Sequence, residues 1–168
     1  MEPFSFSASE EWPEITVECA NPFYAAAMLS NIGSCNSEMS AVSLYFYNHI
    51  VTQTCEPEIS ECFRSISVVE MHHLQIFGTL AHLLGADPRL WNYNHRRPLY
   101  WSPACNHYPR PITALLQNSL QGEKEAISKY QFQIQQIHDC HIQAILNRII
   151  QDEEIHVHIF ETLLQNLE

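Results

Sequence analysis

Two segments decide the fold: EMHHLQIFGTL at residues 70–80 and EEIHVHIFETL at residues 153–163. They share Glu, His, Ile, Phe, Thr and Leu at equal spacings, with a constant offset of 83 residues. Glu and His three residues apart lie on one helix face, about one turn from each other. Each segment therefore predicts a helix that directs a carboxylate and an imidazole toward the same point.

A second pair of segments repeats with an offset of 85 residues. The pattern Glu-x-x-Ala-(Val or Ile)-x-x-Tyr begins at Glu38 and again at Glu123. Chance readily produces one Glu-x-x-His, but not two matched pairs of segments. An old duplication kept only for packing would explain the repeated Ile, Phe and Leu, but it does not explain Glu and His. The repeat predicts two helical pairs related by a pseudo-two-fold axis.

The spacing of apolar residues predicts an all-α chain that folds as a four-helix bundle with one long crossover between the second and third helices. The first helix starts at Pro22, is interrupted near Gly33 and resumes over 37–54. Gly85 is expected to stop the second helix, and Asp139 to cap the fourth. The remaining expected helices cover residues 57–85, 112–138 and 140–167.

Two further segments complete the expected organisation. Residues 86–111 are rich in Pro and aromatic side chains, and they predict an ordered crossover packed over the bundle. Residues 1–21 are acidic and contain Pro, and they predict a poorly ordered N-terminal arm. The bundle domain is expected over residues 22–168.

Charge and cysteine content exclude several classes of protein. Eight basic against 19 acidic residues give a net charge of −11, which argues against nucleic acid and anionic membranes as partners. No secretory signal or membrane span is evident, so we expect a cytoplasmic protein. The six cysteines form no C-x-x-C motif, which argues against a zinc or rubredoxin-type site. We expect reduced thiols, mostly small core residues.

Acidic and imidazole side chains interrupt the apolar stripes of the expected helices. Buried charge is costly unless it is paired or bound to metal. One Glu from each of two helices plus a Glu-x-x-His from each of the others is the ligand set of di-iron and di-manganese bundles. Four carboxylates and two imidazoles suit Fe or Mn better than zinc with sulfur ligands. The predicted ligands are Glu38, Glu70, His73, Glu123, Glu153 and His156.

The predicted ligands have distinct expected roles. Glu70 and Glu153 would bridge two metal ions, Glu38 and Glu123 would be terminal ligands, and each ion would bind one imidazole. Without metal, the converging carboxyl groups are expected to have raised pKa values, because they repel one another and lose hydration.

Three further residues have two readings each. Asp152 either accepts a hydrogen bond from a ligand imidazole or lies on a helix surface. Tyr45 and Tyr130 either hydrogen-bond to a carboxylate or are plain core aromatics. His72 and His158 point away from the apolar stripes and are expected in solvent or at an interface.

The chain resembles the ferritin-like superfamily, most closely rubrerythrin-like proteins and their manganese-catalase relatives. The segments SEMSAVSLYFY, VVEMHHLQIFG, GEKEAISKY and RIIQDEEIHVHIF are similar to the four ligand-bearing helices of that group. The chain lacks the paired C-x-x-C of a rubredoxin domain, and Ala126 stands where rubrerythrins carry an additional carboxylate. The simpler ligand set looks more like bacterioferritin or manganese catalase.

The resemblance and the ligand set imply two alternative functions. One is an oxidoreductase with two Fe or two Mn ions per chain, acting on hydrogen peroxide or dioxygen as a peroxidase or a catalase. A peroxidase of this kind would need an external electron donor. The other is a metal-binding structural, coat or iron-storage protein without catalysis. The resemblance also implies a homodimer or a larger homo-oligomer.

Overall fold

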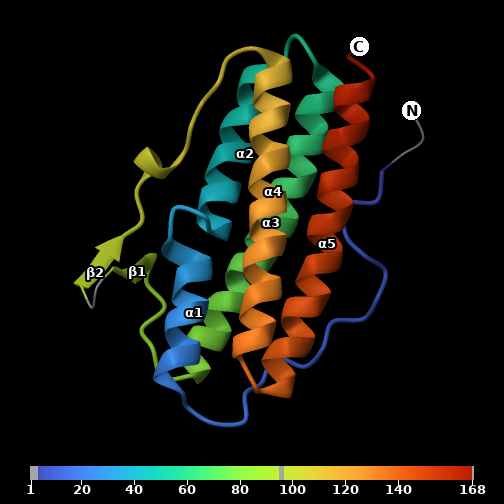
Figure 1. The fold of residues 1–168 in the computed structure, drawn as a ribbon. Helices are drawn as coiled ribbons and strands as arrows, with labels where there is room; N and C mark the ends of the chain where they lie inside the picture. The colour runs from blue at the N-terminus through green and yellow to red at the C-terminus, as the bar shows by residue number, and fades with distance from the viewer. Residues whose placement is uncertain (1–3, 95–96, 168) are drawn as a thin grey trace.

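A computed structural model describes residues 4–94 and 97–167 of the chain. These residues form a bundle of long helices with a small hairpin projecting from one side (Figure 1). In this part of the chain, none of the helices combines the length and the apolar character that crossing a membrane requires. The four-helix bundle with one long crossover is confirmed.

The first bundle helix is made of two shorter helices stacked end to end, as the interruption near Gly33 predicts. Helix α1 covers Pro22–Gly33 and α2 covers Glu38–Thr52. Helix α3, Pro57–Leu83, then runs antiparallel to them (Figure 1). Gly85 has a φ of 94°, in the left-handed region that favours glycine, so it ends the helix as predicted.

The crossover forms an ordered structure on the outside of α1 and α2. It contains the antiparallel strands β1 (Trp91–Asn94) and β2 (Arg97–Tyr100), followed by a short 3-10 helix, η1 (Pro103–Cys105). Beyond the hairpin, Trp101 Nε1 donates to Ser40 Oγ over 2.9 Å, and Asn106 Nδ2 donates to Ser43 Oγ over 2.7 Å. The ordered crossover is confirmed, although the sequence analysis did not predict the hairpin.

The crossover is also joined covalently to the turn between α1 and α2. Cys35 and Cys105 form a disulfide bond, so the expectation that all thiols are reduced is wrong for this pair. The packing of the crossover on α2 brings together two cysteines that are 70 residues apart. The expectation that most cysteines lie in the core is wrong as well, because of the four free cysteines only Cys62 is buried.

The second helical pair consists of α4, Ile112–Gln136, and α5, Cys140–Gln165. Asp139 caps α5 as predicted, accepting hydrogen bonds from the backbone N–H groups of His141 and Ile142. The crossover returns the chain to the end of the bundle where α3 began, so α4 runs in the same direction as α3 (Figure 1). This is the topology that the internal repeat requires.

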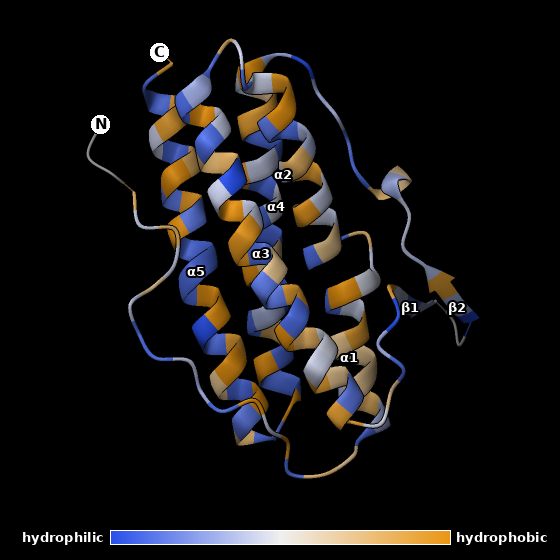
Figure 2. Ribbon diagram, turned by 180° about the vertical axis from the view of Figure 1, so that it is seen from behind, coloured by the Kyte–Doolittle hydropathy of each residue, from blue (hydrophilic) through white to orange (hydrophobic). Residues whose placement is uncertain are grey.

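Two separate hydrophobic clusters fill the bundle, and a polar layer lies between them. Each of the long helices alternates between hydrophobic and hydrophilic stretches (Figure 2). On α3, Phe63 and Ile66 belong to one cluster and Phe77 and Leu80 to the other. Helix α5 repeats this order in reverse. The predicted metal ligands of both helices fall between the two clusters, in surroundings from which water is largely excluded.

The N-terminal arm packs against the bundle instead of being poorly ordered. Residues 4–21 run along the outer side of α5 and pass under the end of the bundle to reach α1 (Figures 1 and 2). The Glu18 N–H donates to Asp139 Oδ2 over 2.7 Å, and the Ala8 N–H donates to Asp152 Oδ1 over 2.7 Å. These buried aspartates of α5 fix a segment whose composition alone suggested a loose end.

Candidate metal centre

The six predicted ligands meet in the polar layer at the middle of the bundle. Each of them is at most 3% exposed. Two groups of ligand atoms form, and within each group all atoms lie within 4.8 Å of one another. Both groups contain Glu70 and Glu153. The first adds Glu38 and His73, and the second adds Glu123 and His156.

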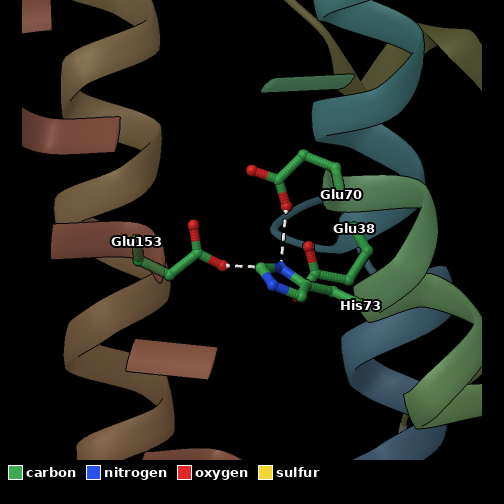
Figure 3. A group of neighbouring side chains, drawn as sticks. All are labelled: Glu38, Glu70, His73 and Glu153. Carbon is green, nitrogen blue, oxygen red and sulfur yellow. Dashed lines mark hydrogen bonds and ion pairs between the residues drawn. The ribbon is translucent and has the colours of Figure 1, made fainter. Parts of the chain in front are cut away.

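Glu70 and Glu153 lie at the centre and each contacts both imidazoles. Glu70 places Oε2 3.2 Å from Nδ1 of His73 and Oε1 3.0 Å from Nδ1 of His156. Glu153 places Oε1 3.3 Å from Nδ1 of His73 and Oε2 3.2 Å from Nδ1 of His156. Figure 3 shows the half of this arrangement around His73. Each central carboxylate therefore spans the two groups.

Two tyrosines bind the outer carboxylates in a crossed pattern. The Tyr45 hydroxyl on α2 donates to Oε1 of Glu123 on α4, and the Tyr130 hydroxyl on α4 donates to Oε1 of Glu38 on α2. Both tyrosines are buried, and burial together with the nearby carboxylates raises the pKa of each phenol, so both stay protonated donors. Of the two readings left open for these residues, the structure shows the hydrogen bond to a carboxylate.

The outer nitrogens of the two imidazoles have different partners. Nε2 of His73 lies 3.0 Å from Oδ2 of Asp152, which is fully buried, so the surface reading of this aspartate does not hold. Nε2 of His156 lies 3.0 Å from the backbone carbonyl oxygen of Phe6 in the arm. The contact with Phe6 could not be predicted from the sequence, because a backbone carbonyl carries no residue signature. Arg148 was not predicted either, although its spacing of four residues before Asp152 could have indicated their ion pair.

Burial and charge set the protonation of the outer carboxyl groups. Burial is the largest cause that raises the pKa of Glu38 and of Glu123 well above the usual value, and the charges of Glu70 and Glu153 add to it. The expected rise is therefore present for both outer carboxyl groups.

The central carboxyl group of Glu70 behaves differently. Burial alone would raise its pKa, but hydrogen bonds and charge interactions with His156 and His73 hold it well below the usual range. Burial would lower the pKa of each imidazole, yet hydrogen bonds to the surrounding carboxylates raise both pKa values well above 6.5. The expectation of a raised carboxyl pKa is wrong for Glu70, because the imidazoles supply positive charge at this point.

The donor set fits a pair of divalent metal ions. Four buried carboxyl groups converge here on two imidazoles, and Oε1 of Glu70 and Oε1 of Glu153 each contact one imidazole nitrogen, at 3.0 and 3.3 Å. Buried carboxylates that outnumber the nearby positive charges are costly unless a cation neutralises them. Carboxylate and imidazole ligands suit Fe and Mn. The buried carboxylate–imidazole clusters thus fit a di-metal site.

A cavity of about 210 Å³ lies against this cluster, between α2 and α4. Its lining includes the buried Glu38 and Glu123 together with the exposed Gln121 and Glu125. The cavity therefore extends from the surface of the bundle to the two outer carboxyl groups. The disulfide-bonded Cys35 and Cys105 also line it.

Solved structures of two kinds share this architecture. KatB, a manganese catalase from Anabaena, superposes with a TM-score of 0.84 and 19% sequence identity, over 98% of this chain and 81% of that chain. Mycobacterium tuberculosis bacterioferritin gives a TM-score of 0.70 and 20% identity, over 89% of this chain and 88% of that chain. A bacterioferritin from Rhodobacter capsulatus gives 0.69 and 21%, over 86% of each chain. This chain has the ferritin-like fold.

The ferritin-like fold accounts for the helices and for their order along the chain. The KatB match covers 98% of this chain, so it extends over the crossover and nearly all of the arm. No protein-family model matches the sequence, and a comparison with curated proteins also finds no match. The likeness to solved structures therefore establishes the fold, and the chemistry must be argued from the residues of this ferritin-like bundle.

Proposed function

We propose that the chain is an oxidoreductase with two Fe or two Mn ions, acting on hydrogen peroxide or dioxygen. The observation that carries the proposal is the position of Glu70 and Glu153, each of which offers one oxygen to either half of the cluster. Such carboxylates are suited to bridging two cations. Glu38 and His73 would complete one metal site, and Glu123 and His156 the other.

The bound metals would supply reversible one-electron redox chemistry and a Lewis-acid surface for an O–O bond. The surrounding chain holds the ligands in place. The crossed hydrogen bonds from Tyr45 and Tyr130 fix the outer carboxylates, and Asp152 orients the imidazole of His73. The two hydrophobic clusters on either side exclude water along the bundle axis.

The cavity between α2 and α4 supports a small oxygen-containing substrate. Its volume of about 210 Å³ admits molecules the size of hydrogen peroxide, and it ends at the outer carboxyl groups. Glu38 and Glu123, the outer ligands proposed for the two ions, line this cavity. A small substrate in it would therefore lie beside the residues that would hold the metals.

Metal analysis and a peroxide assay test this proposal together. The chain, loaded anaerobically with Mn(II) or Fe(II), is expected to bind two ions and to consume hydrogen peroxide. Oxygen evolution without reductant would identify a catalase, and consumption only with a reductant would identify a peroxidase with an external donor. Binding of two ions with no consumption of hydrogen peroxide in either condition, and no consumption of dioxygen by the Fe(II)-loaded protein, would overturn the proposed oxidoreductase activity.

Metal storage is the second candidate, since bacterioferritins are among the similar solved structures. Storage predicts uptake of many Fe ions per chain into an assembled particle. The exposed hydrophobic side chains of Phe46 and Ile50 on α2 and of Val68 and Met71 on α3 support a homo-oligomer in either case. Light scattering and the iron content of the assembled protein distinguish storage from a two-ion centre.

A further inference from the structure

The N-terminal arm contacts the outer edge of one of the proposed ligand imidazoles. Nε2 of His156 lies 3.0 Å from the carbonyl oxygen of Phe6, and this imidazole is fully buried. A carbonyl oxygen can only accept a hydrogen bond, so Nε2 must carry the proton. In the neutral form that would bind a metal, the imidazole therefore has its lone pair on Nδ1, the nitrogen that faces Glu70 and Glu153.

The arm also holds Asp152, the hydrogen-bond partner of the His73 imidazole, in place. Oδ2 of Asp152 lies 3.0 Å from Nε2 of His73, while Oδ1 accepts hydrogen bonds from two arm groups. These are the Ala8 N–H at 2.7 Å and the Ser7 hydroxyl at 3.0 Å. Both imidazoles are therefore oriented through contacts that begin in residues 6–8.

The internal repeat explains why the arm is needed at His156. The offset of 83 residues that relates Glu70 to Glu153 relates Asp152 to position 69. That position holds Val69, whose side chain accepts no hydrogen bond. One half of the bundle thus has an aspartate for its imidazole and the other half does not. The carbonyl of Phe6 provides the acceptor that the second half lacks.

Arg148 and Trp12 hold the arm at this place. The buried guanidinium of Arg148 donates to the carbonyl oxygens of Glu10, at 3.0 Å, and Ala8, at 2.8 Å. It lies 4.4 Å from the ring centroid of Trp12 and pairs with Asp152 at 2.6 Å. The Trp12 ring in turn packs edge-on against His73, at 6.0 Å between ring centroids. The arm and the aspartate form one connected network.

We propose that residues 4–12 are a positioning segment of the di-metal centre, in which the Phe6 carbonyl takes the place of the aspartate missing at position 69. The inference rests on the proposed function, because it concerns how the proposed ligands are oriented. Partners of this kind typically change metal affinity about 10- to 100-fold. We expect loss of the arm contact to weaken the binding of one of the two metal ions more than that of the other.

The test uses full-length variants and Mn(II) as the probe. Phe4 and Phe6 pack against one hydrophobic cluster through their side chains, so Phe4→Ala with Phe6→Ala loosens the arm without touching a proposed ligand. We expect one Mn(II) to bind about 10- to 100-fold more weakly in this double variant. Adding Val69→Asp should restore the affinity to within a few-fold. Val68→Asp is the matched control, because Val68 is 61% exposed, and it should restore nothing.

A second measurement tests the inference on the wild type itself. In the metal-free wild type, the Nε2 proton of His156 should be protected from solvent exchange, as NMR of the labelled imidazole can show. It should lose that protection in the Phe4→Ala, Phe6→Ala variant. Rapid exchange in the wild type would overturn the inference, even if the double variant does not fold.

The outcomes separate this inference from the proposed function. Unchanged affinity for both Mn(II) ions in a folded double variant would overturn the positioning role alone. Equal rescue by Val68→Asp and Val69→Asp would also overturn it, because added charge and not orientation would then explain the effect. If the wild type binds neither Mn(II) nor Fe(II), the proposed function and the role of the arm both fail.

Discussion

The hydroxyl group of Tyr130 on α4 donates a hydrogen bond to Oε1 of Glu38 on α2, and both groups are buried at the centre of the bundle. The mirrored bond from Tyr45 to Glu123 crosses the bundle in the opposite direction. These bonds connect the two repeat halves at the outer carboxylates. Substitution of either tyrosine therefore tests the centre without removing a proposed ligand.

Tyr130→Phe should weaken both the fold and metal binding at one position. It leaves the buried Glu38 without its donor, which should lower the free energy of unfolding of the metal-free protein by about 1–3 kcal/mol. The affinity of Tyr130→Phe for one Mn(II) ion should fall, and Tyr45→Phe should lower the affinity for the other ion. Tyr47→Phe is the control, because Tyr47 contacts the ring of Tyr108 outside the cluster. Equal effects of all three substitutions would contradict the prediction.

In the chelated protein, Glu38→Gln and Glu70→Gln should have different effects on the free energy of unfolding. The raised pKa of Glu38 makes its neutral form favourable, so Gln should change stability by less than about 1 kcal/mol. Glu70 faces two imidazoles and its pKa is held low, so removing its charge should cost about 3–5 kcal/mol. Chemical unfolding with chelator measures both.

Metal stoichiometry gives the second half of that comparison. Glu38→Gln should lose one of two ions, whereas Glu70→Gln should lose both, because Glu70 belongs to both groups of ligand atoms. The exposed Glu154 provides a matched control, and Glu154→Gln should change neither quantity. Full retention of two ions by Glu70→Gln would show that this carboxylate is structural.

The metal-free protein should become less stable as pH rises from about 5 to 9. His73 and His156 have raised pKa values, so the stability they add is complete below the unfolded value of about 6.5 and is lost at higher pH. Glu38 and Glu123 also have raised pKa values, so their ionisation opposes folding above about pH 4.3. The two effects have the same sign.

Thermal unfolding with chelator at several pH values measures this dependence. Excess Mn(II) should reverse the trend, because the ligands must release protons to bind metal and affinity therefore rises with pH. A metal-free protein that gains stability between pH 5.5 and 8.5 would contradict the assigned directions of the pKa shifts.

Cys35→Ser should lower the stability of the bundle. The disulfide to Cys105 closes a loop of 70 residues, and the chain-entropy model assigns such a loop about 4 kcal/mol. Reductant should have the same effect on the wild type and none on the variant. Cys55→Ser, at an exposed free cysteine, is the control. Identical unfolding of Cys35→Ser and wild type would show that the bond does not form in solution.

Much of the centre was predictable because helical periodicity is local. Glu70 and His73 lie one turn apart on α3 whatever the rest of the chain does, and the repeat places Glu153 and His156 in the same way. The stop at Gly85 is equally local, since it reflects the positive φ of a single residue. Gly33 is needed for a different reason: the backbone of Trp91, from the distant crossover, would lie 2.3 Å from an added Cβ, so only glycine fits.

Other features depended on which distant segments meet. The hairpin of the crossover and the Cys35–Cys105 bond follow from how residues 86–111 pack on α1 and α2, a packing that composition does not specify. The low pKa of Glu70 has the same origin, because the sequence indicates four converging carboxyl groups but not the 3 Å contacts with two imidazoles.

By itself, the sequence determined the four helices, their order and the six residues that face the centre, because each follows from spacing within one helix or between two repeats. Only the tertiary structure decided that the arm, 150 residues away in sequence from His156, orients this imidazole. A backbone carbonyl is common to every residue, so its role at Phe6 comes from the path of the chain alone.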